Sequence, residues 1–377
     1  MDLHDLTPVL SAEGPFVTVL VDSESDVEQA SDKYDLAWKN VLRELEEKGV
    51  DAPTRDAIAA AKGEHSQGAA RLVVATASDA TVRLATSLSS SPRRQVVDVS
   101  PLPQLRPLVD EMTRQVPHVV VLADHTGADV SAYDDTDHVT DEITVRGTRT
   151  QHLRKVKGGG WSHHRYQHTA EQGWADNAKE IVSAVEHLAE QVGAQLLVLV
   201  GDERELGYVK EKLSTQWADK VVEVAGARGR DGSETLVPTR VADAVALHVA
   251  HETLDLLGQY AQERGQGKRA VDGLKDVVDA LQKAQVETLL ITTDTEQGAT
   301  LWFGPDPTQL ATSGRELVEL GVADPQEGPM IDVLIRAALG TAADVQLVPG
   351  EMPTAPAMGI GATLRYADSV GTAAAAQ

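Results

Sequence analysis

A run of three glycines, Gly158, Gly159 and Gly160, stands in the most positively charged part of an otherwise acidic chain. Because glycine has no Cβ, the backbone of such a run can approach another surface closely. Residues 143–170 contain no Asp or Glu but contain six cationic side chains, which are Arg146, Arg149, Arg154, Lys155, Lys157 and Arg165. On a chain with a formal net charge of −24, this glycine-tipped cationic segment predicts contact with a phosphate backbone. The alternative is a solvated surface loop.

Histidines in the same segment could also bind a metal ion. They are His152, His163, His164 and His168. His164 and His168 are four residues apart, so on a helix they would share one face, as paired metal ligands do. A zinc peptidase would place a glutamate where Arg165 stands, and a guanidinium repels a cation. We therefore expect no metal ion here, and favour histidines that contact irregular RNA or decorate an exposed helix start.

The glycines and the residues after them also resemble a known loop. Gly159–Tyr166 reads Gly-Gly-Trp-Ser-His-His-Arg-Tyr and resembles the Gly-Gly-Gln-Ser-x-x-Arg-Phe loop of archaeal and eukaryotic class-1 peptide release factors. In that family the loop enters the ribosomal peptidyl transferase centre, where its glutamine helps water to attack peptidyl-tRNA. The resemblance implies an interface with ribosomal RNA made by Arg154, Lys155, Lys157, Gly158, Gly159, Gly160, Trp161, Ser162, His163, His164 and Arg165.

Trp161 occupies the position of the hydrolytic glutamine. An amide both donates and accepts hydrogen bonds, whereas an indole offers one N–H donor and a large flat surface. Trp161 cannot order a nucleophilic water as an amide does, so we expect no catalytic residue and no enzymatic activity. Stacking on a base is the more economical use of an exposed indole. The backbone N–H at this position remains, which leaves weak hydrolysis as the alternative.

Three aspartates could suggest a nuclease-like carboxylate cluster, namely Asp124, Asp129 and Asp134. Side chains alternate between the two faces of a strand, so residues five apart point in opposite directions. Asp129 and Asp134 therefore cannot converge on one site within a regular strand. We interpret all three as carboxylates of turns and strand edges.

The cationic segment lies inside residues 116–268, which we predict to be a middle domain. A hairpin with Gly127 at its tight position precedes the segment, and the glycines run straight into a helix. An amphipathic helix over 172–193, a buried strand over 195–200, a strand over 220–224 and a helix over 241–263 follow. This order resembles the ribonuclease-H-like middle domain of the release factors.

Two further domains are predicted on either side. Residues 1–115 read as an α/β domain, with a strand over 16–22 and a helix capped by Asp51. Residues 269–377 begin with a helix over 271–284 and a strand over 286–291, and Gly359–Tyr366 resembles the close of the release-factor and Pelota C-terminal domains. Those domains share the fold of kink-turn-binding ribosomal proteins. The fold class is α/β throughout.

The charge and the composition exclude several classes of function. Residues 270–377 carry 15 acidic and 5 basic side chains, a net charge of −10, which favours a protein partner over nucleic acid for this end of the chain. There are no cysteines, so disulfides, thiolate catalysis and cysteine-bound metals are excluded. The sequence lacks a signal peptide and a membrane-length apolar run, and we expect a cytoplasmic protein.

The resemblance covers roughly residues 116–377 and points to bacterial members of the archaeo-eukaryotic release factor family, the relatives of the ribosome hibernation factor Balon. It implies a factor that occupies the A site of idle or stalled 70S ribosomes, is delivered by elongation factor Tu and hydrolyses nothing. The alternatives are a rescue factor that cleaves peptidyl-tRNA and an acidic scaffold whose loop binds another anion. No cofactor, DNA or membrane partner is expected.

Overall fold

The computed structural model describes residues 3–23, 30–63, 69–92, 94–124, 127–146, 162–226, 237–267, 269–295 and 298–366, and of residues 3–5, 7, 30 and 162–176 it describes the backbone alone. The chain forms two compact units, residues 114–251 and residues 1–113 together with 252–377. Within the described ranges, no helix combines the length and the apolar character needed to span a membrane.

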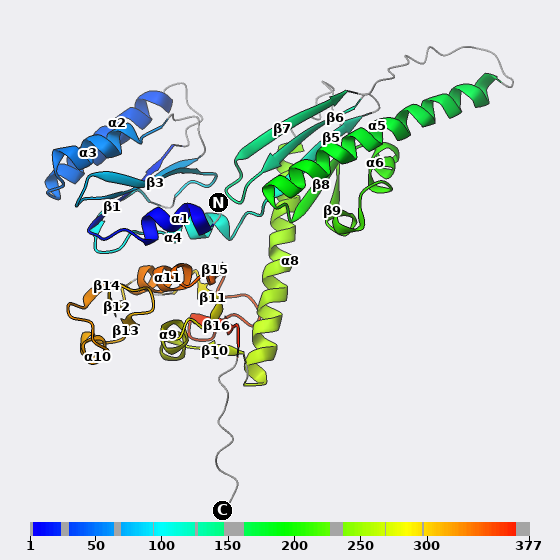
Figure 1. The fold of residues 1–377 in the computed structure, drawn as a ribbon. Helices are drawn as coiled ribbons and strands as arrows, with labels where there is room; N and C mark the ends of the chain where they lie inside the picture. The colour runs from blue at the N-terminus through cyan, green and yellow to red at the C-terminus, as the bar shows by residue number, and fades with distance from the viewer. Residues whose placement is uncertain are drawn as a thin grey trace, which may run out of the picture. The chain divides into compact units, whose positions relative to one another are not determined.

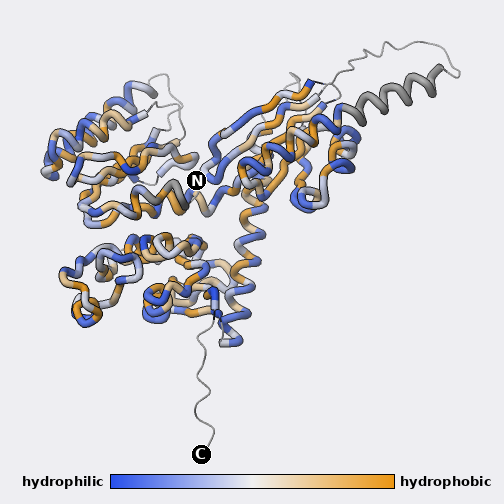
Figure 2. Tube along the Cα trace, viewed as in Figure 1, coloured by the Kyte–Doolittle hydropathy of each residue, from blue (hydrophilic) through white to orange (hydrophobic). Residues whose placement is uncertain are grey.

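Residues 114–251 are built on a five-stranded sheet with the strand order β7-β6-β5-β8-β9 (Figure 1). Its strands are β5 (His118–Asp124), β6 (Gly127–Tyr133), β7 (Val139–Arg146), β8 (Leu196–Gly201) and β9 (Val221–Ala225). The first three form an antiparallel meander, and β8 runs parallel to both β5 and β9. β5 and β8 are nearly continuous aliphatic runs, mostly orange in Figure 2, because side chains on both faces of the sheet are buried.

Helices cover both faces of this sheet. They are α5 (Ser162–Val192), α6 (Glu203–Lys210), α7 (Thr215–Ala218) and the first part of α8 (Val237–Gly265). Ile181, Val185 and Leu188 recur at helical spacing on α5 and are buried against one face of the sheet. Val245 of α8 is buried in a separate cluster that includes Val198 and belongs to the other face. Burial of each such side chain stabilises the fold by roughly 1.5–3 kcal/mol.

Gly127 is required where β6 begins. Its φ is +151°, and a Cβ there would lie 2.0 Å from the carbonyl oxygen of Val145 on β7.

Gly127→Ala should therefore lower the free energy of unfolding by about 2–4 kcal/mol, through a backbone clash and strain. Urea denaturation followed by circular dichroism measures the loss. The control is Gly207→Ala on α6, where nothing lies within 4 Å and where the better helix former should stabilise by up to about 1 kcal/mol. Equal effects of both substitutions would contradict the requirement.

The N-terminal part of the other unit is a four-stranded antiparallel sheet with the order β3-β2-β1-β4. Its elements are α1 (Leu3–Leu10), β1 (Phe16–Asp22), α2 (Ala30–Glu47), α3 (Ala52–Ala60), β2 (Ala70–Thr76), β3 (Thr81–Leu88), β4 (Val96–Ser100) and α4 (Arg106–Met112). The predicted cap of α3 is confirmed, since the Asp51 carboxylate accepts a hydrogen bond from the Thr54 amide at 3.2 Å.

The C-terminal part of that unit carries two small sheets, with the orders β10-β16-β11-β15 and β13-β12-β14. Its elements are β10 (Ala270–Asp272), α9 (Leu274–Gln282), β11 (Val286–Thr292), β12 (Thr300–Phe303), β13 (Leu310–Ala311), α10 (Gly314–Glu319), β14 (Gln326–Pro329), α11 (Met330–Gly340), β15 (Asp344–Val348) and β16 (Ile360–Leu364). The helix predicted over 271–284 was wrong at its start, because residues 270–272 form a strand paired with β16.

The N-terminal and C-terminal parts of this unit share one hydrophobic core. Phe16 of β1 and Leu108 of α4 belong to the same buried cluster as Leu289 of β11, Phe303 of β12 and Leu334 of α11. The other face of the N-terminal sheet packs separately on α2 and α3. The overall class is therefore a mixed α/β chain with several sheets, as predicted.

Candidate nucleic-acid interface

The predicted RNA-binding residues fall on the connection between β7 and α5. β7 ends at Arg146 and α5 begins at Ser162, so residues 147–161, here called the Gly-Gly-Trp loop, join an edge strand to a helix. The prediction that the glycines lead directly into a helix is confirmed. Ser162, His163, His164 and Arg165 are the first residues of α5. Arg154, Lys155, Lys157, Gly158, Gly159, Gly160 and Trp161 lie outside the described residues.

α5 anchors the C-terminal end of the loop. The helix has 31 residues, which corresponds to a length of about 46 Å at 1.5 Å per residue. From Ala178 onward its apolar face is buried on the sheet, through Ile181, Val185 and Leu188 among others. The C-terminal half of α5 is thus held on the sheet, and the chain enters the helix from the loop at the opposite end, Ser162.

A hydrogen-bonded strand anchors the other end. Arg146, the last residue of β7, lies opposite Gly127 in the antiparallel register, and Val145 before it is buried. The Asp124 carboxylate accepts a hydrogen bond from the Gly127 amide at 3.0 Å, which links the end of β5 to the start of β6. The loop therefore leaves the sheet from its edge strand, beside the β5–β6 hairpin.

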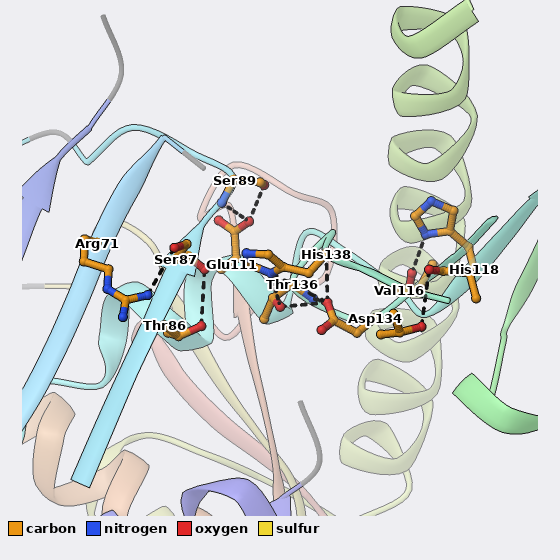
Figure 3. A network of polar contacts seen from close by, with 12 residues as sticks. Arg71, Thr86, Ser87, Ser89, Glu111, Val116, His118, Asp134, Thr136 and His138 are labelled. Carbon is orange, nitrogen blue, oxygen red and sulfur yellow. Dashed lines mark hydrogen bonds and ion pairs between the residues drawn. The ribbon is translucent and has the colours of Figure 1, made fainter. Parts of the chain in front are cut away.

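The three aspartates do not converge on one site. Asp124 accepts a hydrogen bond from the Gly127 amide, and Asp129 accepts one from the Thr144 hydroxyl at 2.9 Å, across the β6–β7 pair. Asp134 accepts from the amides of Thr136 at 2.8 Å and His138 at 3.0 Å, as Figure 3 shows. These bonds agree with the interpretation of all three carboxylates as turn and strand-edge groups.

A buried histidine at the far end of the hairpin had no counterpart in the sequence-based predictions. His118, the first residue of β5, is 1% exposed and its ring stacks on Tyr133, with centroids 4.7 Å apart and planes 2° apart. Its Nδ1 lies 2.8 Å from the Val116 carbonyl oxygen, so Nδ1 carries the proton (Figure 3). Burial lowers the pKa of His118. In the sequence, His118 is a single histidine before an aliphatic run, and that pattern does not indicate a buried and stacked ring.

The lowered pKa of His118 predicts acid sensitivity. Because the folded chain binds this proton less readily than the unfolded chain, stability is retained above about pH 6.5 and is lost as the pH falls below it. The free energy of unfolding of His118→Phe, which keeps the stacked ring but cannot titrate, should therefore depend less on pH between 7.5 and 5.5 than that of the wild type. Urea denaturation at each pH measures this. His187→Gln, at an exposed position of α5, should follow the wild type, and a His118→Phe profile parallel to the wild type would contradict the prediction.

Comparison with known proteins assigns the segment that carries the loop. Residues 117–266 match the model of bacterial archaeo-eukaryotic release factor family 2. The chain therefore contains, over these residues, a domain of the bacterial archaeo-eukaryotic release factor family, as its sequence predicted. The matched range includes the meander, the Gly-Gly-Trp loop, α5 and the whole of the five-stranded sheet.

Relatives of the full chain are also found. The uncharacterised protein Rv2629 of Mycobacterium tuberculosis is 26% identical over 365 residues, which cover 95% of each chain. Among solved structures, Pelota of Archaeoglobus fulgidus is 18% identical over 78% of this chain and 79% of its own, with a TM-score of 0.35. Dom34 of S. cerevisiae, described as a translation termination-like factor, is 10% identical over 97% of this chain and 94% of its own, with a TM-score of 0.40.

Proposed function

We propose that this protein binds the bacterial ribosome through the Gly-Gly-Trp loop and does so without hydrolysing peptidyl-tRNA. In this proposal the factor occupies the A site of idle or stalled 70S ribosomes, as a hibernation factor related to Balon. The loop points toward the peptidyl transferase centre, and Arg154, Lys155, Lys157 and Arg165 contact ribosomal RNA. The N-terminal part of the chain faces the decoding centre.

One observation carries this proposal. The release-factor family match spans residues 117–266, and within that span the connection between β7 and α5 holds the Gly-Gly-Trp-Ser sequence and a cluster of cationic side chains. The charge supports an RNA target, because cationic groups on an acidic chain concentrate its attraction for phosphate in one place. Trp161 supports binding without chemistry, because an indole stacks but does not order water as an amide does.

The finer domain assignments belong to the same proposal. We divide the chain into residues 1–115, 116–268 and 269–377, with a ribonuclease-H-like middle domain and a C-terminal domain of the kink-turn-binding ribosomal-protein type. The mixed sheet of the middle segment and the small four-stranded sheet of the C-terminal part are compatible with these folds.

A translational GTPase is the proposed protein partner, with elongation factor Tu as the specific candidate. The acidic C-terminal segment supports a protein contact, since a net charge of −10 over residues 270–377 opposes binding to RNA. The test is capture of purified elongation factor Tu by the full chain without ribosomes, in the presence of GTP and, separately, of GDP. Absence of capture in both nucleotide states would remove elongation factor Tu from the proposal and leave ribosome binding intact.

Peptidyl-tRNA hydrolysis is the competing function. It is favoured by the glycines, Ser162 and Arg165, which match the hydrolytic loop of the release factors, and by the backbone N–H that remains at position 161. Trp161 is the specific departure from that loop. The two functions differ in one measurable outcome, the release of peptide from ribosomes that hold peptidyl-tRNA.

Co-sedimentation with purified 70S ribosomes tests the proposal as a whole. The full chain should pellet with vacant ribosomes, and imaging of the bound fraction should show the loop near the peptidyl transferase centre. A parallel sedimentation from lysates of growing and starved cells shows whether ribosome occupancy rises when translation stops. A chain that stays in the supernatant under all these conditions would support the scaffold alternative instead.

A further inference from the structure

Three charged side chains meet where the N-terminal and C-terminal parts of the second unit pack together. Asp98 comes from β4, Arg106 begins α4, and Asp332 lies in the first turn of α11. All three belong to the compact unit formed by residues 1–113 and 252–377. We call this contact the acid seam. Asp332 is 8% exposed, so its carboxyl group is almost removed from solvent.

The hydrogen bonds of the acid seam do not satisfy all of its charge. Arg106 donates from Nη2 to the Thr293 carbonyl oxygen at 2.9 Å, across the seam. Its Nη1 is buried and has no hydrogen-bond partner among the described residues. The Asp98 carboxylate accepts a hydrogen bond from the Gln104 side chain at 2.7 Å. One side of the guanidinium therefore binds a backbone carbonyl, and Arg106 acts on the Asp332 carboxyl group through its charge rather than through a hydrogen bond.

Burial of two carboxyl groups beside one guanidinium favours a bound proton. If Asp98 and Asp332 were both ionised, the seam would hold a net negative charge away from water, which is costly. Burial and, to a smaller extent, the nearby Asp98 carboxylate raise the pKa of Asp332 to about 7, and Arg106 opposes the shift. Arg336, one turn further along α11, directs its guanidinium to the carbonyl oxygens of Pro305 and Asp306.

We propose that the acid seam is a proton-linked joint, in which the contact of α4 with α11 is closed while Asp332 is protonated and opens locally when Asp332 ionises, with the hydrophobic core that the two parts share still packed. Asp98 and Arg106 are the charged groups that face Asp332 from the neighbouring elements. Asp98 holds the proton on Asp332 in the closed state, and Arg106 connects α4 to the Thr293 carbonyl oxygen across the joint. This inference is independent of ribosome binding.

The direction in which pH changes the stability of the closed joint follows from which state holds the proton. The closed joint binds a proton that the opened, solvated Asp332 releases, so closure is fully stabilised at about pH 4 and loses stability as the pH rises toward 7. The equilibrium constant for opening should increase by about tenfold per pH unit between about pH 4 and pH 7, and should level off above about pH 7. The joint would then respond to pH most steeply just below neutrality.

Hydrogen–deuterium exchange of the full-length chain tests the joint. Exchange of the α4 and α11 amides is compared between the wild type and Asp332→Asn, which mimics the protonated carboxyl, at matched pH values from 5.5 to 8.0. Taking the ratio of the two proteins at each pH cancels the chemical pH dependence of exchange. We expect the ratio to rise about tenfold per pH unit up to about pH 7 and then to flatten.

Two further variants keep the test decisive. Asp276→Asn removes a carboxylate from the equivalent first-turn position of α9, where it is exposed, so its exchange should match that of the wild type at every pH. Asp98→Asn removes the charge that favours the proton on Asp332, and should shift the rise to lower pH. The joint would be overturned by a ratio that stays constant with pH, or by an equal pH response of Asp276→Asn. If Asp332→Asn does not fold, the comparison of wild type with Asp98→Asn supplies the same reading.

Discussion

Ribosome binding should weaken by about tenfold or more when Arg154, Lys155, Lys157 and Arg165 are changed to Ala together, because contacts with phosphate dominate this kind of affinity. The dependence of affinity on salt should change as well. Each phosphate contact contributes about 0.7–0.9 to the slope of log K against log salt, so loss of four contacts should make the slope shallower by about three. Sedimentation with 70S ribosomes over a range of salt concentrations measures both quantities.

A matched variant separates the loop from general charge effects. Lys33, Lys39 and Arg43 are exposed on α2 and Lys48 is exposed directly after it, and their replacement by Ala removes the same charge from a different surface. This control should keep most of the affinity and most of the salt slope. If the loop variant and the control behaved alike, or if neither changed, the Gly-Gly-Trp loop would not be the RNA-binding element.

Trp161 should contribute to binding and should prevent chemistry. Trp161→Ala should weaken binding by about 1–3 kcal/mol, which is the value of stacking one base on an aromatic side chain and corresponds to about 5-fold to 150-fold in affinity. The wild type should release no peptide from ribosomes that hold peptidyl-tRNA, whichever codon is in the A site. Peptide release and sedimentation are measured on the same preparations.

A single substitution at Trp161 should give the protein the peptide release that the wild type lacks. Trp161→Gln restores Gly-Gly-Gln-Ser and should produce detectable peptide release, because the neighbouring glycines and Arg165 are already present. Gly159→Val in the same background should abolish that release, since the backbone could no longer approach closely. Robust release by the wild type that is lost in Gly159→Val would establish the rescue-enzyme function and contradict binding without hydrolysis.

Local signals predicted much of the fold. The strand at 16–22, the cap at Asp51 and the hairpin turn at Gly127 were all placed by nearby residues, and all are confirmed. Short or distant pairings were not predictable. Residues 270–272 were read as helix because their strand is defined by pairing with residues 361–363, about ninety positions later. The sheet of β12, β13 and β14 has strands of two to four residues, too short for a periodic pattern.

The candidate site, like the fold, was predictable from the sequence only in part. The position of the loop before a helix was readable from its glycines, although α5 begins ten residues before the start predicted from apolar spacing. The first part of the helix is rich in polar residues, so its periodicity is weak there. Asp332 gave no signal, since an Asp in a first helical turn is usually an exposed and favourable partner of the helix N-terminus. Its burial depends on a core shared by residues more than two hundred positions apart.

The start of α5 at Ser162 has a further consequence for the loop. The aligned peptide dipoles of a long helix place roughly half a positive charge at its N-terminus, and the first amide groups there lack partners within the helix. No acidic residue stands in the first turn of α5 to neutralise this charge. The backbone therefore adds a positive region directly after Trp161 that no side-chain substitution removes. The variant with Arg154, Lys155, Lys157 and Arg165 replaced by Ala should therefore keep a weak, residual attraction for anions.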